Sequence, residues 1–128
     1  MTGRGVILVV DDDPDIRDAL REVFLAEGFS VADARHGAEA LDWLRTHDGA
    51  IGILLDLMMP VLDGWAFRAE QLADPRLASI PVIVLSAHAS RGDVAQLGAA
   101  AFLSKPVDLD ALLLAVGQHF QRSTPTTG

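Results

Sequence analysis

The sequence predicts an α/β domain in which a parallel sheet is covered by helices on both faces. Short runs of consecutive apolar, often β-branched residues, such as 6–10 and 82–85, are typical of strands buried on both sides. Segments with apolar residues at helical spacing follow these runs, so that strand and helix alternate five times along the chain. This alternation indicates three layers joined by right-handed crossovers.

The composition narrows the class of protein before any motif is considered. A chain of 128 residues is expected to form one domain whose core needs no disulfide or metal to fold. It has no cysteine, as is usual in a reducing compartment. The net charge of −8 argues against direct binding to nucleic acid, because phosphate contacts need a basic surface. No signal-peptide pattern or membrane-length apolar run is present, so we expect a cytoplasmic protein without membrane attachment.

The first strand is expected at residues 6–10 and leads directly into Asp11-Asp12-Asp13-Pro14. Proline suits the first turn of a helix, and the aspartate before it can cap that helix. Gly28 is expected to end this helix. Its inward apolar stripe consists of Ile16, Leu20, Val23 and Phe24. Its solvent-facing side is expected to consist of Arg17, Asp18, Arg21 and Glu22.

The middle of the chain repeats the pattern. Residues 29–34 form a second, weaker strand, and Gly37 opens a second helix. Residues 51–55 are expected to form the third strand, which ends at Asp56. Asp63-Gly64 is a turn signal, and a third helix is predicted at residues 65–73. The inward side of the second helix consists of Ala40, Leu41 and Leu44.

The last third contains two more strands and two helices. Residues 81–86 form the fourth strand, with its proline at the permitted first position. Ser90-Arg91-Gly92-Asp93 resembles a capping box, which predicts a short fourth helix that reaches about Leu97. A short fifth strand at 101–104 is broken by Lys105-Pro106, and Asp108 is expected to cap the last helix. The domain is expected to span residues 5–121, between flexible termini at 1–4 and 122–128.

Polar side chains end four of the five buried runs, and these ends are expected to meet at one edge of the sheet. They are Asp11 to Asp13, Asp56, Ser86 and Lys105. In open parallel sheets, sites lie beyond the carboxyl ends of the strands, where strand order reverses. Carboxylates about 5 Å apart repel each other by roughly 3 kcal/mol per pair, so a cation must offset them. Lys105 and a hard divalent ion such as Mg²⁺ are suited to this, and the set predicts a phosphoryl-transfer site with a carboxylate nucleophile.

Each of these signals has an ordinary explanation when it is taken alone. An aspartate-rich turn before a helix is more often a cap than a metal site. A single aspartate at the end of a strand is more often a turn or capping residue, and a lone serine or lysine there is usually just hydrogen-bonded or solvated. The shared site is predicted because all four signals occur at strand ends that the topology brings together.

Five motifs together resemble the receiver domain of two-component response regulators, of the stand-alone type found among chemotaxis regulators. They are Val9-Val10-Asp11-Asp12-Asp13-Pro14, Asp56-Leu57-Met58-Met59-Pro60, Asp63-Gly64, Leu85-Ser86-Ala87 and Lys105-Pro106. The likeness covers nearly the whole chain. It implies a flavodoxin-like fold with strand order 2-1-3-4-5. It also implies Mg²⁺-dependent phosphorylation of Asp56 by the phosphohistidine of a sensor histidine kinase or a histidine phosphotransfer protein.

The resemblance also implies a role for each site residue. Asp12 and Asp56 bind Mg²⁺ directly, Asp11 binds it largely through water, and the backbone carbonyl of Met58 is a further ligand. Lys105 pairs with the phosphoryl oxygens.

The same family likeness implies a conformational switch. Ser86 hydrogen-bonds the phosphoryl group, and Phe102 occupies the aromatic switch position. Phosphorylation then biases an equilibrium between two packings, which a downstream protein reads through the face formed by helix 4, strand 5 and helix 5. The alternative for Phe102 is an ordinary core aromatic.

Two features depart from the family pattern. The segment between Ser86 and Lys105 is about one helical turn shorter than is typical, which leaves the mode of coupling to a partner open. Met58 and His88 occupy the variable positions that flank the phosphoryl group, and neither is suited to orient an attacking water. We therefore predict slow self-dephosphorylation.

The sequence is also compatible with two other functions. Asp11-Asp12-Asp13 after an apolar strand also fits the start of haloacid-dehalogenase-type phosphatases, with Asp11 as nucleophile and Asp13 as general acid. Against this, Asp15 stands where a threonine or serine is expected. The second alternative is a receiver-like binding module that never takes a phosphoryl group. The favoured prediction is a signalling domain rather than an enzyme.

Overall fold

The computed structural model describes residues 5–87 and 95–120. Strands and helices alternate along the chain as the sequence predicts, and each helix lies between two strands except the last. The elements are β1 (Val6–Val10), α1 (Pro14–Ala26), β2 (Ser30–Ala34), α2 (Gly37–Thr46), β3 (Ala50–Asp56), α3 (Gly64–Ala73), β4 (Val82–Ser86), β5 (Ala101–Ser104) and α5 (Leu109–His119).

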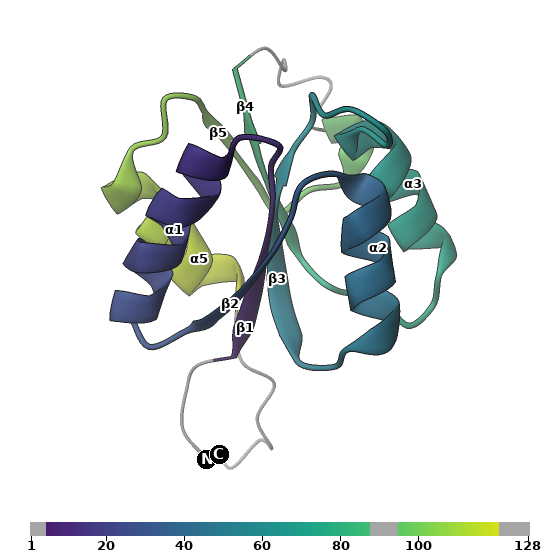
Figure 1. The fold of residues 1–128 in the computed structure, drawn as a ribbon, viewed down its shortest axis with the longest axis horizontal. Helices are drawn as coiled ribbons and strands as arrows, with labels where there is room; N and C mark the ends of the chain where they lie inside the picture. The colour runs from purple at the N-terminus through teal and green to yellow at the C-terminus, as the bar shows by residue number, and fades with distance from the viewer. Residues whose placement is uncertain (1–4, 88–94, 121–128) are drawn as a thin grey trace.

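The five strands form one parallel sheet in the order β2-β1-β3-β4-β5, which confirms the predicted fold class. Helices α1 and α5 cover one face of the sheet, and α2 and α3 cover the other (Figure 1). The chain leaves β1 toward one edge through β2 and then returns to place β3 on the other side of β1. The direction in which the chain adds strands therefore reverses between β1 and β3, and in such sheets sites lie beyond the carboxyl ends of the strands at this point.

Two hydrophobic cores lie on opposite faces of the sheet, because successive strand side chains point to opposite sides. In β1, Leu8 and Val10 belong to the core under α2 and α3, whereas Ile7 and Val9 belong to the core under α1 and α5. All four of these side chains are buried. This explains why β1 reads as a continuous apolar run rather than an alternating one.

Aspartates cap three of the helices. The Oδ1 atom of Asp13 accepts from the N–H of Asp15 at 2.9 Å in α1, and Asp108 caps α5 in the same way, as predicted. Asp63, predicted only as part of a turn, caps α3 by accepting from the N–H of Ala66 at 2.9 Å. Helix α3 therefore begins at Gly64, one residue earlier than expected.

The cap of α2 was not predicted. His36 occupies this position, and its Nδ1 accepts from the N–H of Glu39 at 3.3 Å. Only a neutral imidazole has an acceptor nitrogen, so this cap depends on the tautomer with an unprotonated Nδ1.

A buried polar pair sits on the core-facing side of α3. Arg68 donates to the carbonyls of Leu97 and Gly98 at 2.9 and 3.1 Å, and to Oε1 of Gln71 at 2.7 Å. Gln71 in turn donates to the carbonyl of Leu77 at 2.9 Å. Burial lowers the pKa of the Arg68 guanidinium. The pair ties α3 to the segment that leads into β5.

Some predictions fall outside the described residues. Residues 95–97 are helical, but the expected capping box from Ser90 to Asp93 and His88 are not among the residues described. The predicted flexible termini at 1–4 and 122–128 also lie outside, so the domain limits of 5–121 remain a proposal. Within the described part of the chain, none of the helices has the length and apolar character needed to cross a membrane.

Candidate functional site

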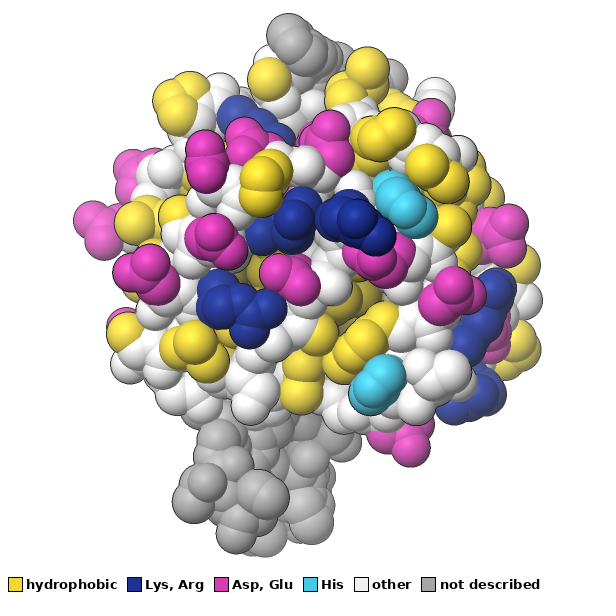
Figure 2. Space-filling model, viewed as in Figure 1, with side chains coloured by type: hydrophobic (Ala, Val, Ile, Leu, Met, Phe, Trp, Pro, Cys, Tyr) yellow, Lys and Arg dark blue, Asp and Glu magenta, His cyan; other side chains and the backbone are white. Residues whose placement is uncertain are grey.

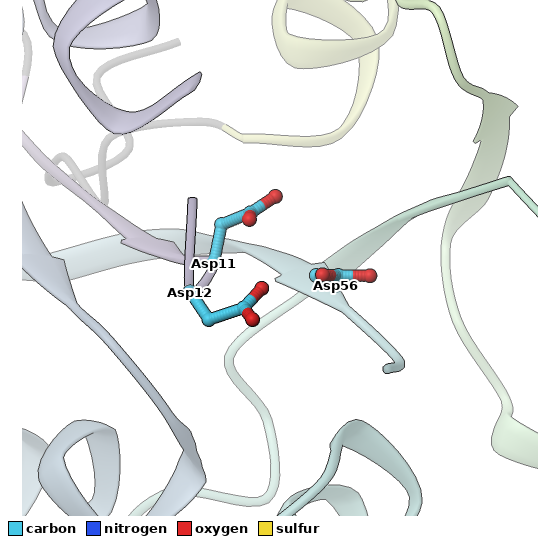
Figure 3. A group of neighbouring side chains, drawn as sticks. All are labelled: Asp11, Asp12 and Asp56. Atoms are coloured by element: carbon cyan, nitrogen blue, oxygen red, sulfur yellow. The ribbon is translucent and has the colours of Figure 1, made fainter. Parts of the chain in front are cut away.

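Three aspartates gather at the carboxyl ends of β1 and β3. Asp11 and Asp12 follow β1 and Asp56 ends β3, and one carboxylate oxygen of each lies within 4.8 Å of the others. Figure 3 shows the three side chains side by side beyond the strand ends. Asp11 and Asp56 are 2% and 6% exposed, whereas Asp12 is exposed. The cluster is therefore buried on the sheet side and open to solvent at Asp12.

Lys105 bridges two of these carboxylates. Its Nζ lies 2.9 Å from Oδ2 of Asp11 and 3.4 Å from Oδ2 of Asp56. Its backbone N–H donates to the carbonyl of Ser86 at 3.1 Å, which positions it just beyond β5. Burial alone would lower the pKa of Lys105, but the hydrogen bond to Asp11 and the two negative charges outweigh it, and the pKa is raised. The ammonium therefore stays charged at neutral pH.

The Asp56 carboxylate is held in an unfavourable environment for a charge. Burial and then the charge of Asp11 raise the pKa of Asp56, against the opposing effects of Lys105 and of the backbone N–H of Met58. That N–H donates to Oδ1 of Asp56 at 3.2 Å. One lysine does not balance three neighbouring carboxylates, so a further cation would relieve the remaining repulsion.

The donor set suits a hard divalent cation such as Mg²⁺, which prefers carboxylate and carbonyl oxygens. Both oxygens of Asp11 already have partners, because Oδ1 accepts from the N–H of Asp13 at 2.9 Å and Oδ2 contacts Lys105. In the part of the chain that the structure describes, the Asp12 carboxylate accepts no such bond. Asp12 is thus freer than Asp11 to bind a cation directly, whereas each oxygen of Asp56 has a contact, with the Met58 N–H and with Lys105.

The loop after Asp56 is packed closely against the first turn of α3. A Cβ placed on Gly64 would lie 2.6 Å from the Asp56 carbonyl oxygen and 2.7 Å from Cα of Leu57. The N–H of Gly64 donates to the carbonyl of Leu57 at 3.0 Å. Only glycine permits this approach, so the Asp-Gly motif does more than turn the chain. Met58 lies in the same loop with its side chain exposed.

The two predicted switch residues lie on neighbouring strands. Ser86 ends β4, is buried, and pairs with Ser104 of β5 in the sheet register. Phe102 pairs with Val84 and is half-buried against the core beneath α2 and α3. The topology thus brings Ser86 to the same end of the sheet as Asp56, whose register partner is Leu85.

Arg17 was predicted on the solvent-facing side of α1, and this is wrong. Its side chain is only 13% exposed, and its Nη1 donates to the backbone carbonyl of Asp11 at 2.6 Å. Its Nε lies 3.7 Å from Oδ2 of Asp33 on β2. Helical periodicity reports which way a Cβ points, whereas a long side chain can turn its charged end elsewhere. The available signal was Asp33, an acid within a strand that lies next to β1.

The family model described as the response regulator receiver domain matches residues 7–117. The chain belongs to this family. The receiver domain is 39% identical over 125 residues to the transcriptional regulatory protein GlrR of Escherichia coli K12, covering 94% of this chain and 27% of that protein. It is 39% identical over 110 residues to the response regulator Rre1 of Synechocystis, covering 83% of this chain and 47% of that protein. It therefore spans about a quarter to a half of the length of these curated relatives.

Solved structures of receiver domains superpose on this one. A response regulator receiver protein from Pseudomonas putida gives a TM-score of 0.85 at 31% identity, over 92% of this chain and 99% of that chain. The chemotaxis response regulator CheY4 of Vibrio cholerae gives 0.82 at 25% identity, over 90% and 98%. The receiver domain is a signalling domain of two-component systems, and the comparisons give no support to a phosphatase with Asp11 as nucleophile.

Proposed function

We propose that Asp56 accepts a phosphoryl group, with the help of Mg²⁺, from the phosphohistidine of a histidine kinase or a histidine phosphotransfer protein. The observation that carries this proposal is the buried Asp56 carboxylate with a raised pKa. It is clustered with the carboxylates of Asp11 and Asp12 and with the ammonium group of Lys105. A carboxylate kept in such surroundings is better explained by a chemical role than by a contribution to stability.

The proposed metal ligands come from the family likeness, and the clustering of Asp11, Asp12 and Asp56 supports them. Asp12 and Asp56 bind Mg²⁺ directly, Asp11 does so largely through water, and the Met58 carbonyl completes the protein ligands. When bound, the metal offsets the negative charge that the carboxylates and the phosphoryl oxygens bring together.

In the transfer step, a carboxylate oxygen of Asp56 attacks phosphorus in line with the bond to the donor imidazole. The nitrogen–phosphorus bond breaks as the oxygen–phosphorus bond forms, and its electron pair returns to the imidazole nitrogen. Lys105, already charged and 3.4 Å from Asp56, neutralises a phosphoryl oxygen. Ser86 hydrogen-bonds the phosphoryl group from the end of β4.

The product is an acyl phosphate, which suits a transient signal. Movement of Ser86 toward the phosphoryl group opens space for Phe102, and this repacking changes the surface near β5 and α5. A downstream protein in the cytoplasm is the proposed reader of this surface. The part of this surface that α5 forms includes the exposed apolar side chains of Leu109 and Leu114.

The test is phosphorylation of the purified chain by a small-molecule phosphodonor such as acetyl phosphate in the presence of Mg²⁺. Intact-mass spectrometry is expected to detect one phosphoryl group on the wild type and on Asp18→Asn, a control at an exposed acid outside this cluster. Asp56→Asn is expected to remain unlabelled. Labelling of Asp56→Asn would move the nucleophile to Asp11 or Asp12. An unlabelled wild type would favour a binding module that never takes phosphate.

A further inference from the structure

We propose that Arg17 is a positioning residue for the metal-binding carboxylates, and this inference rests on the proposed function. Arg17 lies on α1, and none of its contacts described above is with a site carboxylate. It reaches the site through the backbone instead: its Nη1 donates to the carbonyl oxygen of Asp11 at 2.6 Å. Residues that hold metal ligands from behind are often needed for affinity almost as much as the ligands themselves.

The Asp11 carbonyl needs this donor. Asp11 is only 2% exposed, and its N–H donates to the carbonyl of Ala34 on β2 at 3.1 Å. Its two carboxylate oxygens are occupied by the N–H of Asp13 and by Lys105. Its carbonyl lies just past β1, beyond the sheet register that ends at Val10. A backbone carbonyl without a hydrogen-bond donor in such a buried residue would destabilise the fold, and the guanidinium of Arg17 is a charged donor for it.

Holding this carbonyl also orients Asp12. The carbonyl of Asp11 and the N–H of Asp12 belong to one planar peptide unit, so fixing the carbonyl fixes the plane from which Asp12 extends. The Asp12 carboxylate is exposed and has no hydrogen bond within the described residues. Its backbone therefore sets the point from which the side chain extends, and one guanidinium supports two of the three clustered aspartates.

Arg17 is itself held in place. Asp33 on β2 lies 3.7 Å from its Nε, and the same carboxylate oxygen lies 3.2 Å from Nη2 of Arg21, one helical turn further along α1. Arg21 uses its Nη1 for the carbonyl of Val31 at 3.2 Å and not for Asp11. On the face of the molecule drawn in Figure 2, basic and acidic side chains are interleaved, with no large area of one sign. Arg17 and Arg21 thus both contact Asp33, but they donate hydrogen bonds to different backbone carbonyls.

The positive charge of Arg17 and its hydrogen bond to Asp11 are expected to have opposite effects on Mg²⁺ affinity. A cation close to the acidic cluster repels Mg²⁺, so removing the charge alone should tighten binding. Removing the hydrogen bond to Asp11 should weaken it. Arg21 provides a matched control, because Arg21→Met also removes a cation bound to Asp33 while leaving the Asp11 carbonyl untouched.

The experiment is isothermal titration of Mg²⁺ into the unphosphorylated chain, with thermal melting in EDTA to verify the fold of each variant. Arg17→Met is expected to raise the Mg²⁺ dissociation constant by about 10- to 100-fold. Arg21→Met is expected to change it by less than about twofold, because its charge is screened by solvent. Arg17→Lys keeps the charge and one donor, is the milder change for folding, and is expected to fall between wild type and Arg17→Met.

The result that overturns the inference is an unchanged or lower dissociation constant in Arg17→Met. An equal loss of Mg²⁺ affinity in Arg17→Met and Arg21→Met would also overturn the inference, because a general effect on stability or charge would then explain both results. Binding of Mg²⁺ by the wild type and its loss in Asp12→Asn support the proposed function independently of Arg17. A wild-type chain that binds no Mg²⁺ would overturn both.

Discussion

Replacing Asp56 by asparagine is expected to stabilise the metal-free protein at neutral pH, although it removes the proposed phosphoacceptor. Burial and the neighbouring Asp11 raise the pKa of Asp56 above its ordinary value of 3.8. A raised folded-state pKa means that the folded protein binds the proton more tightly than the unfolded chain does. The associated stability is fully present below about pH 3.8 and is lost as the pH rises through the folded-state pKa. At pH 7 the ionised Asp56 carboxylate therefore destabilises the folded protein.

The magnitude follows from two destabilising contributions, burial and repulsion by Asp11, and one stabilising contribution, attraction by Lys105. Burial of one ionised group costs several kcal/mol in real proteins. Asp11, whose carboxylate lies within 4.8 Å, adds about 3.5 kcal/mol of repulsion at an effective dielectric near 20. Lys105, at 3.4 Å, returns about 5 kcal/mol of attraction on the same scale. The balance is a penalty of about 1 to 3 kcal/mol, which asparagine removes.

The assay is urea unfolding in EDTA, in which the free energy of unfolding of Asp56→Asn is compared with that of the wild type between pH 4 and pH 7. The difference is expected to be largest at pH 7 and to shrink toward pH 4, and in thermal melts each kcal/mol corresponds to about 4 °C. Asp18→Asn, at an exposed position on α1, is expected to change stability by less than about 0.5 kcal/mol. A metal-free Asp56→Asn protein less stable than wild type at pH 7 would refute the reasoning, because Lys105 would then outweigh burial and Asp11.

Three other changes test separate parts of the structure. Gly64→Ala is expected to lower the thermal midpoint and the rate of phosphorylation by acetyl phosphate, because its Cβ would lie 2.6 Å from the Asp56 carbonyl oxygen. Gly117→Ala on α5, where a Cβ meets nothing within 4 Å, is expected to raise the free energy of unfolding by up to about 1 kcal/mol, and a loss there would contradict the open space around it. Arg68→Met is expected to lower the free energy of unfolding by about 2 kcal/mol or more in denaturant titrations, because three acceptors, two of them in buried hydrogen bonds, lose a charged donor. A neutral result would mean that relief of the buried charge compensates. The phosphorylated protein is expected to lose its label slowly, since the apolar Met58 does not orient water, and a half-life of seconds would contradict this.

Most of the fold could be predicted because strands buried on both faces leave an unambiguous pattern. The first strand matches β1 residue for residue, and the third differs from β3 by one residue at each end. Helix starts were less predictable. Asp63-Gly64 is equally suited to a turn and to a cap, and the choice depends on packing against Leu57 that the local sequence does not contain. His36 was missed as a cap because imidazole accepts a hydrogen bond only in one neutral tautomer.

The clustering of the aspartates could be predicted because topology alone brings the ends of β1 and β3 together. The contacts of the two buried arginines could not be predicted, because their partners are mainly main-chain carbonyls. Arg17 bonds the carbonyl of the residue that follows the first strand, and Arg68 bonds carbonyls about thirty positions away in sequence. Any residue type supplies a carbonyl, so no sequence pattern marks such a partner. A polar Arg68 and Gln71 on the same stripe as buried Phe67 was the available sign that α3 carries a buried network.

The sheet separates the two hydrophobic cores so completely that they are expected to behave as independent energetic compartments. Phe24 lies in the core under α1 and α5, and Phe67 lies in the core under α2 and α3. Because the strands stand between them and they share no core cluster, truncations at the two sites should add to within about 0.5 kcal/mol. Each face of the receiver domain can therefore accumulate substitutions without compensation on the other, while the strand ends that carry the aspartates stay fixed by both.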